Sequence, residues 1–276
     1  MNKILNIAFA LAFAVLFVAC NPIEKDFGTG EVVTSADQLN VTITPVMFKT
    51  YKTNKYKVQC KSPVVCKWST TGSYISNDTT VMILGKGTQN IKLTAMAADG
   101  SVLTKTYSVT VDSMYYPVPP QWGYLCGTGS KTWVWAVDNK YSGSQWIWGN
   151  GGRSGDIAPA WWGRTASDAS AEGIDISGTM SFSLDAATFT KVENGATTKG
   201  SFSFDMTPSS TTKGIGTLSI SGATIQHGVS QNDGKKVVYK FDIIKLTNDE
   251  LVLEYSTESN NYEGWFWVFK RQGFSY

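Results

Sequence analysis

The sequence has few histidines and few charged residues, and both shortages exclude classes of function. His227 is the only histidine in 276 residues, which removes most catalytic triads and most histidine-based metal sites. Neither His-Glu-x-x-His nor Gly-x-Ser-x-Gly occurs. Charged residues make up 17% of the chain, and 24 Lys and Arg nearly balance 22 Asp and Glu without forming a basic block. We therefore expect no catalytic residues, no cofactor, no metal site and no nucleic-acid partner.

Long apolar runs are also scarce, and the one clear example lies at the N-terminus. Residues 4–18 form an apolar run after Lys3, of signal-peptide length and too short for a transmembrane helix. The run ends in Leu-Phe-Val-Ala-Cys at Cys20, which resembles the lipobox of bacterial lipoproteins, although Phe17 stands where that family usually has leucine. The alternative is an ordinary secretory signal.

The lipoprotein resemblance implies a signal peptide at 1–19 and a lipidated, palmitate-bearing Cys20. Residues 20–38 are polar and would form the tether between the lipid and the first domain. Acidic residues in 21–26 are similar to signals that send lipoproteins to the outer face of the outer membrane. The implied location is the outer membrane, lipid-anchored and facing the cell exterior.

Cysteine is the next scarce residue. With Cys20 assigned to lipid, Cys60 and Cys66 could close a small disulfide loop around Pro63, while Cys126 has no evident partner. Buried free thiols are equally compatible with the sequence. Three cysteines and a lone histidine match no zinc spacing.

Helical periodicity is absent at useful length, and short alternating segments predict an all-β protein. Residues 39–113 read as a small β-sandwich, most clearly in the hairpin from Ile91 to Val111 around Asp99-Gly100. The segment from Lys67-Trp68 to Val111 resembles a PKD or immunoglobulin-like domain, with KWSTTGS in place of the usual signature. That resemblance implies a spacer domain.

A proline-rich linker, 114–120, separates this sandwich from a larger second domain, 121–276. About eight antiparallel strands are expected there, including 132–137 and 237–243, with hairpin turns at Asn194-Gly195 and near residues 232–234 and 248–249. They would form a closed barrel or a second sandwich. The ending LTNDELVLEYS…EGWFWVFKR resembles the last hairpin of bacterial lipocalin-like domains, which favours a barrel.

Tryptophan is the residue that is abundant, and it is concentrated at the start of the second domain. The pairs Trp133 with Trp135 and Trp265 with Trp267 recur at i and i+2, which is typical of the core face of a strand; a pocket wall at a barrel mouth is the alternative. Four others lie among glycines in loop-like sequence, which favours exposure of their rings as much as burial. These are Trp146, Trp148, Trp161 and Trp162.

Polar side chains alternate with these four tryptophans. Asn150, Arg153 and Asp156 could bind sugar hydroxyls while the indole rings stack on the apolar face of a sugar. The structural alternative is an Arg153–Asp156 salt bridge that orders the loop. Residues 149–152 (GNGG) precede no helix and carry no lysine, so they predict turns and not a phosphate loop.

A glycoside hydrolase would need two carboxylates facing one cleft. Glu254 alternates with Leu251 and Leu253 on a predicted strand and is expected to face solvent, while Asp156 has no visible partner. A hydrolase is therefore the third hypothesis.

The lipobox, the PKD-like segment and the motifs KTWVW, WGNGG, PAWW, DELVLEY and WFWVFK together resemble surface glycan-binding lipoproteins of polysaccharide-utilisation systems. The resemblance implies non-catalytic capture of a polysaccharide or oligosaccharide for uptake, beside an outer-membrane glycan importer. The second hypothesis is an adhesion or assembly protein whose tryptophans contact another protein. The glycan and any help from calcium are left open.

Overall fold

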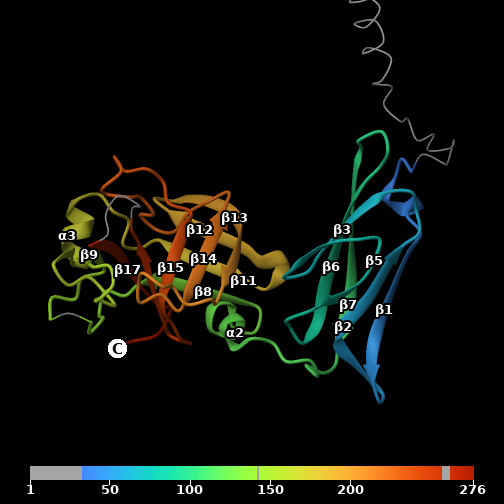
Figure 1. Ribbon diagram of the computed structural model, residues 1–276, viewed down its shortest axis with the longest axis horizontal. Helices are drawn as coiled ribbons and strands as arrows, with labels where there is room; N and C mark the ends of the chain where they lie inside the picture. The colour runs from blue at the N-terminus through green and yellow to red at the C-terminus, as the bar shows by residue number, and fades with distance from the viewer. Residues whose placement is uncertain (1–32, 142, 257–261) are drawn as a thin grey trace, which may run out of the picture.

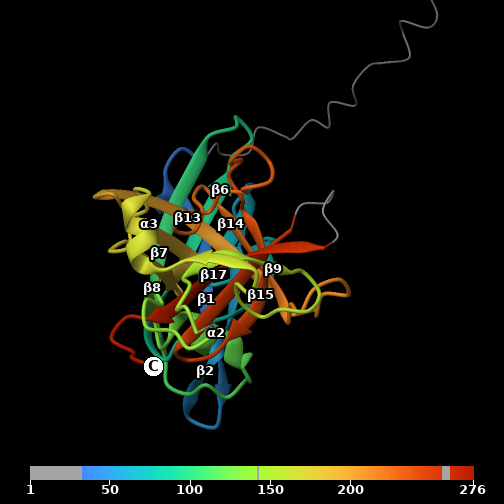
Figure 2. The ribbon, with the colours of Figure 1, turned by 90° about the vertical axis from the view of Figure 1, so that its left-hand side faces the viewer.

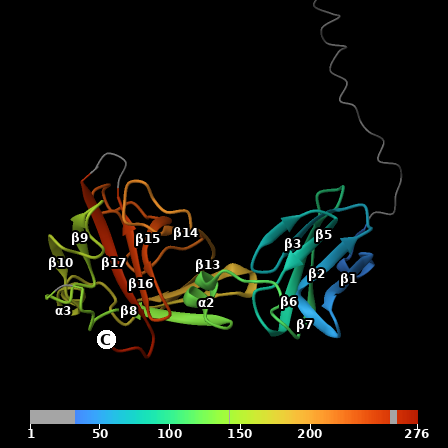
Figure 3. The same ribbon diagram turned by 60° about the horizontal axis from the view of Figure 1, so that its bottom comes forward.

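The computed structural model describes residues 33–141, 143–256 and 262–276, which form two β domains joined near a short helix, α2 (Figures 1 and 3). The predicted signal peptide, Cys20 and most of the predicted tether lie outside the described residues. Within the described residues, no helix has the length and apolar character needed to cross a membrane.

The first domain is a sandwich of two antiparallel sheets that follows a 3-10 turn, η1 (Ala36–Gln38). Trp68, Ile91 and Leu93 are fully buried between the sheets, on the inward positions of their alternating strands. One sheet has the order β1-β2-β5 and the other β4-β3-β6-β7. The strands are β1 (Val41–Phe48), β2 (Tyr51–Cys60), β3 (Val65–Ser69), β4 (Ser73–Ile75), β5 (Asp78–Met82), β6 (Gly87–Met96) and β7 (Val102–Val111).

The second domain is a closed antiparallel barrel, so the choice between barrel and sandwich is settled in favour of a barrel. Eight strands run in the order β8-β11-β12-β13-β14-β15-β16-β17, and β17 pairs again with β8 to close the ring. Closure leaves no free edge among these strands. They are β8 (Ser130–Trp135), β11 (Thr179–Ser183), β12 (Thr188–Glu193), β13 (Ala196–Asp205), β14 (Gly216–Ser221), β15 (Lys240–Leu246), β16 (Glu250–Tyr255) and β17 (Glu263–Arg271).

Two further strands, β9 and β10, extend the barrel wall at one end: Figure 2 labels β9 beside β17, and Figure 3 labels both strands. Strand β17 pairs with β8 through residues 269–271 and with β9 (Trp148–Gly152) through residues 263–267. Strand β9 then pairs with β10 (Trp162–Arg164), which leads into helix α3 (Ala166–Ala171). The chain thus leaves the barrel after Trp135, forms a loop, and returns to the same edge of β17.

The prediction of an all-β protein is confirmed, and the turns at 99–100, 194–195 and 248–249 each join two paired strands. The turn near 232–234 lies inside the long connection between β14 and β15 and encloses only an isolated bridge. Asn194 and Gly195 both have positive φ, 52° and 74°, as the turn between β12 and β13 requires. Two strand predictions were too long. Val237 and Tyr239 are exposed and lie before β15, where Val237 forms only an isolated bridge to Val229, and exposed Val137 lies after β8.

All three described cysteines, Cys60, Cys66 and Cys126, are buried free thiols. Burial, together with a thiol hydrogen bond to Cys60, raises the pKa of Cys66 to about 12. The structure therefore contains the free-thiol alternative and not the disulfide.

A second apolar cluster lies on the outside of the barrel. Val252, Phe266 and Val268 point away from the barrel core on β16 and β17, and Ala136 and Ala158 cover them. The loops between β8 and β10 therefore cover part of the outer wall, which explains why β16 and β17 are buried on both faces.

Candidate functional site

Three indole rings, those of Trp148, Trp162 and Trp265, gather where β17 begins, and the ring of Trp161 lies next to Gly152 on the adjoining strand β9. We call these four tryptophans the tryptophan cluster. The ring centroids of Trp148 lie 5.5 Å from Trp162 and 5.4 Å from Trp265, and those of Trp162 and Trp265 are 6.0 Å apart. Trp148 and Trp265 are 4% and 8% exposed, whereas Trp161 and Trp162 are 57% and 37% exposed. The cluster therefore has a buried base and an exposed outer part.

Strand alternation explains why these rings meet. Trp148 and Asn150 share one face of β9 and are register partners of Trp267 and Trp265, whose rings belong to the barrel core. Trp162 is paired with Asn150 on the same face. A Cβ on Gly152, the next residue on that face, would lie 3.4 Å from Trp161 Cζ2, so the Trp161 ring covers Gly152.

Close approach of β9 and β10 depends on two paired glycines, Gly149 and Gly163. A Cβ on Gly149 would lie 2.2 Å from the carbonyl oxygen of Trp162, and a Cβ on Gly163 would lie 2.5 Å from Trp146 Cγ. The prediction that residues 149–152 form turns was wrong, because they lie in strand β9, where the glycines allow close pairing with β10. Trp146 packs against the face of this strand pair opposite the tryptophan cluster.

Three buried polar atoms in the tryptophan cluster lack a hydrogen-bond partner among the described residues. They are the indole Nε1 of Trp148, the indole Nε1 of Trp265 and Oδ1 of Asn150. By contrast, the Nε1 of Trp267 donates to the carbonyl of His227 at 3.0 Å. A buried donor or acceptor without a partner is costly, so these two donors and one acceptor are candidates for hydrogen bonds to water or to a ligand.

Polar side chains border the tryptophan cluster. Glu263 accepts hydrogen bonds from the amide groups of Asn150 and Asn232, the latter at 2.6 Å, and so orients the Asn150 side chain. The His227 ring lies 4.7 Å from Trp148, and burial lowers its pKa below the ordinary value, which keeps the ring neutral at pH 7. The Arg164 guanidinium lies 4.0 Å from the Trp162 ring and also donates to Glu172, so it fixes that ring in place.

The predicted site residues separate into two groups. One group comes together and contains Trp148, Asn150, Trp161 and Trp162. The Trp148 ring is buried, although its glycine-rich sequence had favoured exposure as much as burial. Trp146 lies on the opposite face of the hairpin. Arg153 and Asp156 belong to the loop after β9: Asp156 accepts from the backbone N–H of Gly152 at 2.6 Å, and Arg153 donates to Thr211 at 3.2 Å, beside a different pocket.

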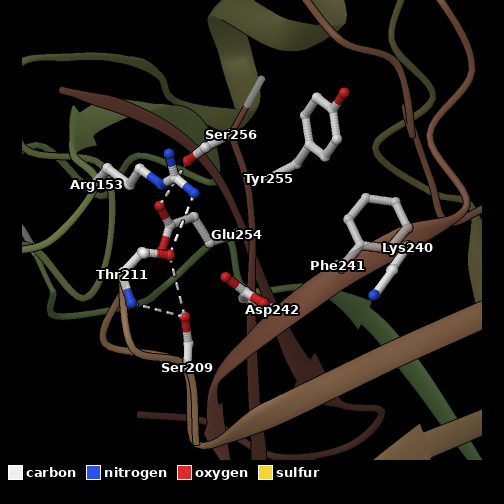
Figure 4. A pocket seen from close by; sticks show the side chains of 9 residues that line it. All are labelled: Arg153, Ser209, Thr211, Lys240, Phe241, Asp242, Glu254, Tyr255 and Ser256. Atoms are coloured by element: carbon white, nitrogen blue, oxygen red, sulfur yellow. Dashed lines mark hydrogen bonds between the residues drawn. The ribbon is translucent and has the colours of Figure 1, made fainter. Parts of the chain in front are cut away.

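That pocket lies on the outer wall of the barrel and encloses about 320 Å³ (Figure 4). Asp242 on β15 and Glu254 on β16 are register partners, so their carboxyl groups lie side by side on this wall. Figure 4 shows Arg153 above Glu254 and Lys240 on the far side of Asp242. A pair of carboxylates is the arrangement that glycoside hydrolysis uses.

Glu254 does not face solvent, and that prediction was wrong. Its side chain points away from the barrel core as the alternation indicates, but the loop that carries Arg153 covers it and it is fully buried. Its Oε1 accepts from Ser256, its Oε2 has no partner among the described residues, and burial raises its pKa to about 8. A fully buried carboxyl group cannot contact a substrate, so this pair does not form an accessible acid–base site.

Trp265, His227 and Glu263 were missing from the predicted site. Trp265 was assigned to the core because it is two residues from Trp267, and the sequence did not show that β17 starts at the rim. His227 and Glu263 are distant from the tryptophan-rich segment in sequence. Within the described residues, no group of three His, Cys, Asp or Glu side chains could hold a metal ion.

No protein-family model matches the chain, and no curated protein matches it. Among solved structures, one described as a study of carbohydrate-binding modules from the β-sandwich superfamily is similar. It is 13% identical, and the match covers 84% of this chain and 90% of that chain with a TM-score of 0.23. At that identity and TM-score, the likeness establishes neither the fold nor the function of this chain.

Proposed function

We propose that the protein binds a polysaccharide or oligosaccharide, without cleaving it, at the tryptophan cluster. The observation that carries the proposal is the combination of exposed Trp161 and Trp162 rings with the unpartnered Trp148 and Trp265 N–H groups and Asn150 Oδ1. A sugar ring offers an apolar C–H face to indole and hydroxyl groups that both donate and accept hydrogen bonds. A sugar would therefore both stack on the exposed rings and hydrogen-bond to the unpartnered atoms.

A contact with another protein would use the same exposed rings. Such an interface favours a broad apolar patch, whereas the buried base of this cluster carries unpaired hydrogen-bonding atoms. These atoms have almost no accessible surface in the structure, so a ligand reaches them only if the rings of Trp161 and Trp162 move, and a small hydroxyl group needs a smaller opening than a protein surface does. The unpaired atoms therefore favour the saccharide over the protein partner.

Affinity for a single sugar unit would be weak. Each well-placed aromatic contact contributes on the order of 1 kcal/mol, and Trp161 and Trp162 supply two exposed rings. Longer chains that cross both rings should bind more tightly than a monosaccharide. We also propose that the lipid on Cys20 holds this domain at the cell exterior, where it would capture glycans for uptake by an importer.

Affinity electrophoresis through gels that contain different polysaccharides tests the saccharide proposal. The wild-type protein should be retarded by at least one glycan, and Trp161→Ala should lose most of that retardation because it removes the most exposed ring of the cluster. Tyr51→Ala, which removes an equally exposed ring from the first domain, is the matched control and should migrate as wild type. Equal retardation of Trp161→Ala and wild type would contradict the proposal.

A further inference from the structure

A groove of about 510 Å³ runs between the two domains, on the side of the barrel away from β9 and β10 (Figure 3). Its walls come from β3 and β6 of the sandwich and from η2 (Asp185–Ala187) and β13 of the barrel. The hydroxyl group of Thr71 donates to the carbonyl oxygen of Leu184 at 2.6 Å across the junction, and Leu84 of the sandwich packs against the barrel core. These contacts hold the two walls together.

The barrel side of the groove carries an aromatic platform. Trp122 of helix α2 (Pro120–Cys126) lies with its ring centroid 4.4 Å from Phe204 and 5.7 Å from Phe202 on β13. Trp122 is only partly buried, and all three rings line the groove. A planar ring fixed by two others is a suitable stacking surface for a sugar.

The sandwich side carries two lysines. Lys67 on β3 is the register partner of Thr94 on β6, and Lys92 is the partner of Ser69, so the two lysines are diagonal neighbours roughly 7 Å apart on one face. Both side chains are exposed, and neither forms an ion pair within the described part of the chain. No carboxylate lines the groove, although Asp185 is next to it in sequence.

Hydroxyl groups complete the lining from both domains, including Ser73 and Thr94 from the sandwich and Ser201 and Ser203 from the barrel. The groove thus combines an aromatic surface, two ammonium groups and several hydroxyl groups. Two ammonium groups without a facing carboxylate favour a ligand that carries negative charge.

We propose that this interdomain groove is a second saccharide site and that it binds an anionic sugar unit. The sugar ring stacks on Trp122 while its carboxylate or sulfate group accepts hydrogen bonds from Lys67 and Lys92. The site shares no residue with the tryptophan cluster, so the test of the groove does not depend on whether the cluster binds a saccharide.

Isothermal titration calorimetry of the full chain at low ionic strength tests the proposal. The probes are trigalacturonate for the carboxylate form, a sulfated trisaccharide for the sulfate form and maltotriose as the neutral reference. Wild type should bind at least one anionic probe more tightly than maltotriose, and its affinity should fall as salt is raised, because exposed charges are screened. The probe that binds better identifies the anionic group.

The double variant Lys67→Gln, Lys92→Gln should lose about tenfold or more in affinity for that probe, since each ammonium group supplies a charge-assisted hydrogen bond. The matched control is Lys61→Gln, Lys86→Gln, which removes the same net charge from exposed positions of the same domain outside the groove. The control and Trp161→Ala should both bind as wild type.

Three results for the wild type, the groove variant and its control would overturn the proposal, and so would a fourth result for Trp161→Ala. The first three are the absence of binding of either anionic probe to wild type, an unchanged affinity in the Lys67 and Lys92 variant, and an equal loss in the control. If Trp161→Ala alone abolishes anionic binding, the anion binds at the tryptophan cluster and the interdomain site does not exist.

Discussion

Glu254 is a buried carboxylic acid, and its ionisation links the stability of the barrel to pH. A Cβ on Gly264, the residue beside it on β17, would lie 2.2 Å from Glu254 Oε1, so this glycine makes the space that the side chain fills. The enclosure removes the carboxyl group from water, which raises its pKa to about 8 from the ordinary value of 4.5. The folded state therefore holds a proton that the unfolded chain releases near pH 4.5.

This raised pKa predicts a loss of stability as the solution becomes alkaline. Below pH 4.5 both states are protonated and the full stability is present; between about pH 4.5 and 8 it falls, because only the unfolded state ionises readily. The loss should be on the order of a few kcal/mol. Glu254→Gln cannot ionise, so urea denaturation at pH 5, 7 and 9 should show a flatter dependence than wild type.

The control for this measurement is Asp185→Asn, which removes an exposed carboxylate from the same domain and should keep the wild-type pH dependence. A Glu254→Gln variant that loses stability with pH as steeply as wild type would show that Glu254 ionises normally in the folded protein.

At the scale of elements, the β9–β10 hairpin positions the exposed rings, and its register depends on Gly149. Because a Cβ there would lie 2.2 Å from the Trp162 carbonyl oxygen, Gly149→Ala should push β10 away from β9 and displace Trp162. We expect a destabilisation of about 1–3 kcal/mol, as for other overpacked sites, and loss of glycan retardation in affinity electrophoresis. Gly155→Ala, where an added Cβ meets nothing within 4 Å, is the control.

If the glycan retards Gly149→Ala as strongly as it retards the wild-type protein, the β9–β10 hairpin does not position the binding surface.

The strands themselves could be predicted from the sequence because their evidence is local. Alternation in 91–97 and the Asn194-Gly195 turn depend only on neighbouring residues, and both predictions are confirmed. Strand β17 pairs with β8 at one end and with β9 at the other, and both partners are distant in sequence. No local sequence pattern predicts this pairing. The pairing decides that Trp148 faces the cluster while Trp146, two residues earlier, packs on Gly163.

The site could be predicted only in part for the same reason. Its tryptophan-rich segment was conspicuous in composition, and Trp148, Asn150, Trp161 and Trp162 do come together. Arg153 and Asp156 follow the same segment but lie beside the outer wall, because the loop after β9 folds over Glu254. His227 and Glu263 reach the cluster from elements that are distant in sequence.

At the scale of the whole molecule, we propose that a lipid on Cys20 anchors the two domains, and the groove between them, to the outer membrane. Cys20→Ser should abolish incorporation of labelled palmitate and move the protein from the membrane fraction to the soluble fraction, because a thioether-linked lipid requires the cysteine. Cys126→Ser, which changes a buried thiol in the barrel, should still incorporate palmitate. Absence of lipid on the wild-type protein in its native cells would contradict the anchor.

The central claim is that a sugar hydrogen-bonds to the unpartnered indole groups at the base of the tryptophan cluster. The ten tryptophans give ten indole N–H signals in a nitrogen–proton correlation spectrum. Four indole groups already donate to carbonyl oxygens, at distances of 2.9–3.1 Å, and provide internal references: Trp68, Trp133, Trp135 and Trp267.

Titration with an oligosaccharide of the retarding glycan should shift the signals of Trp148 and Trp265 and leave the signals of these four references in place. Unchanged Trp148 and Trp265 signals at saturating oligosaccharide would contradict the account.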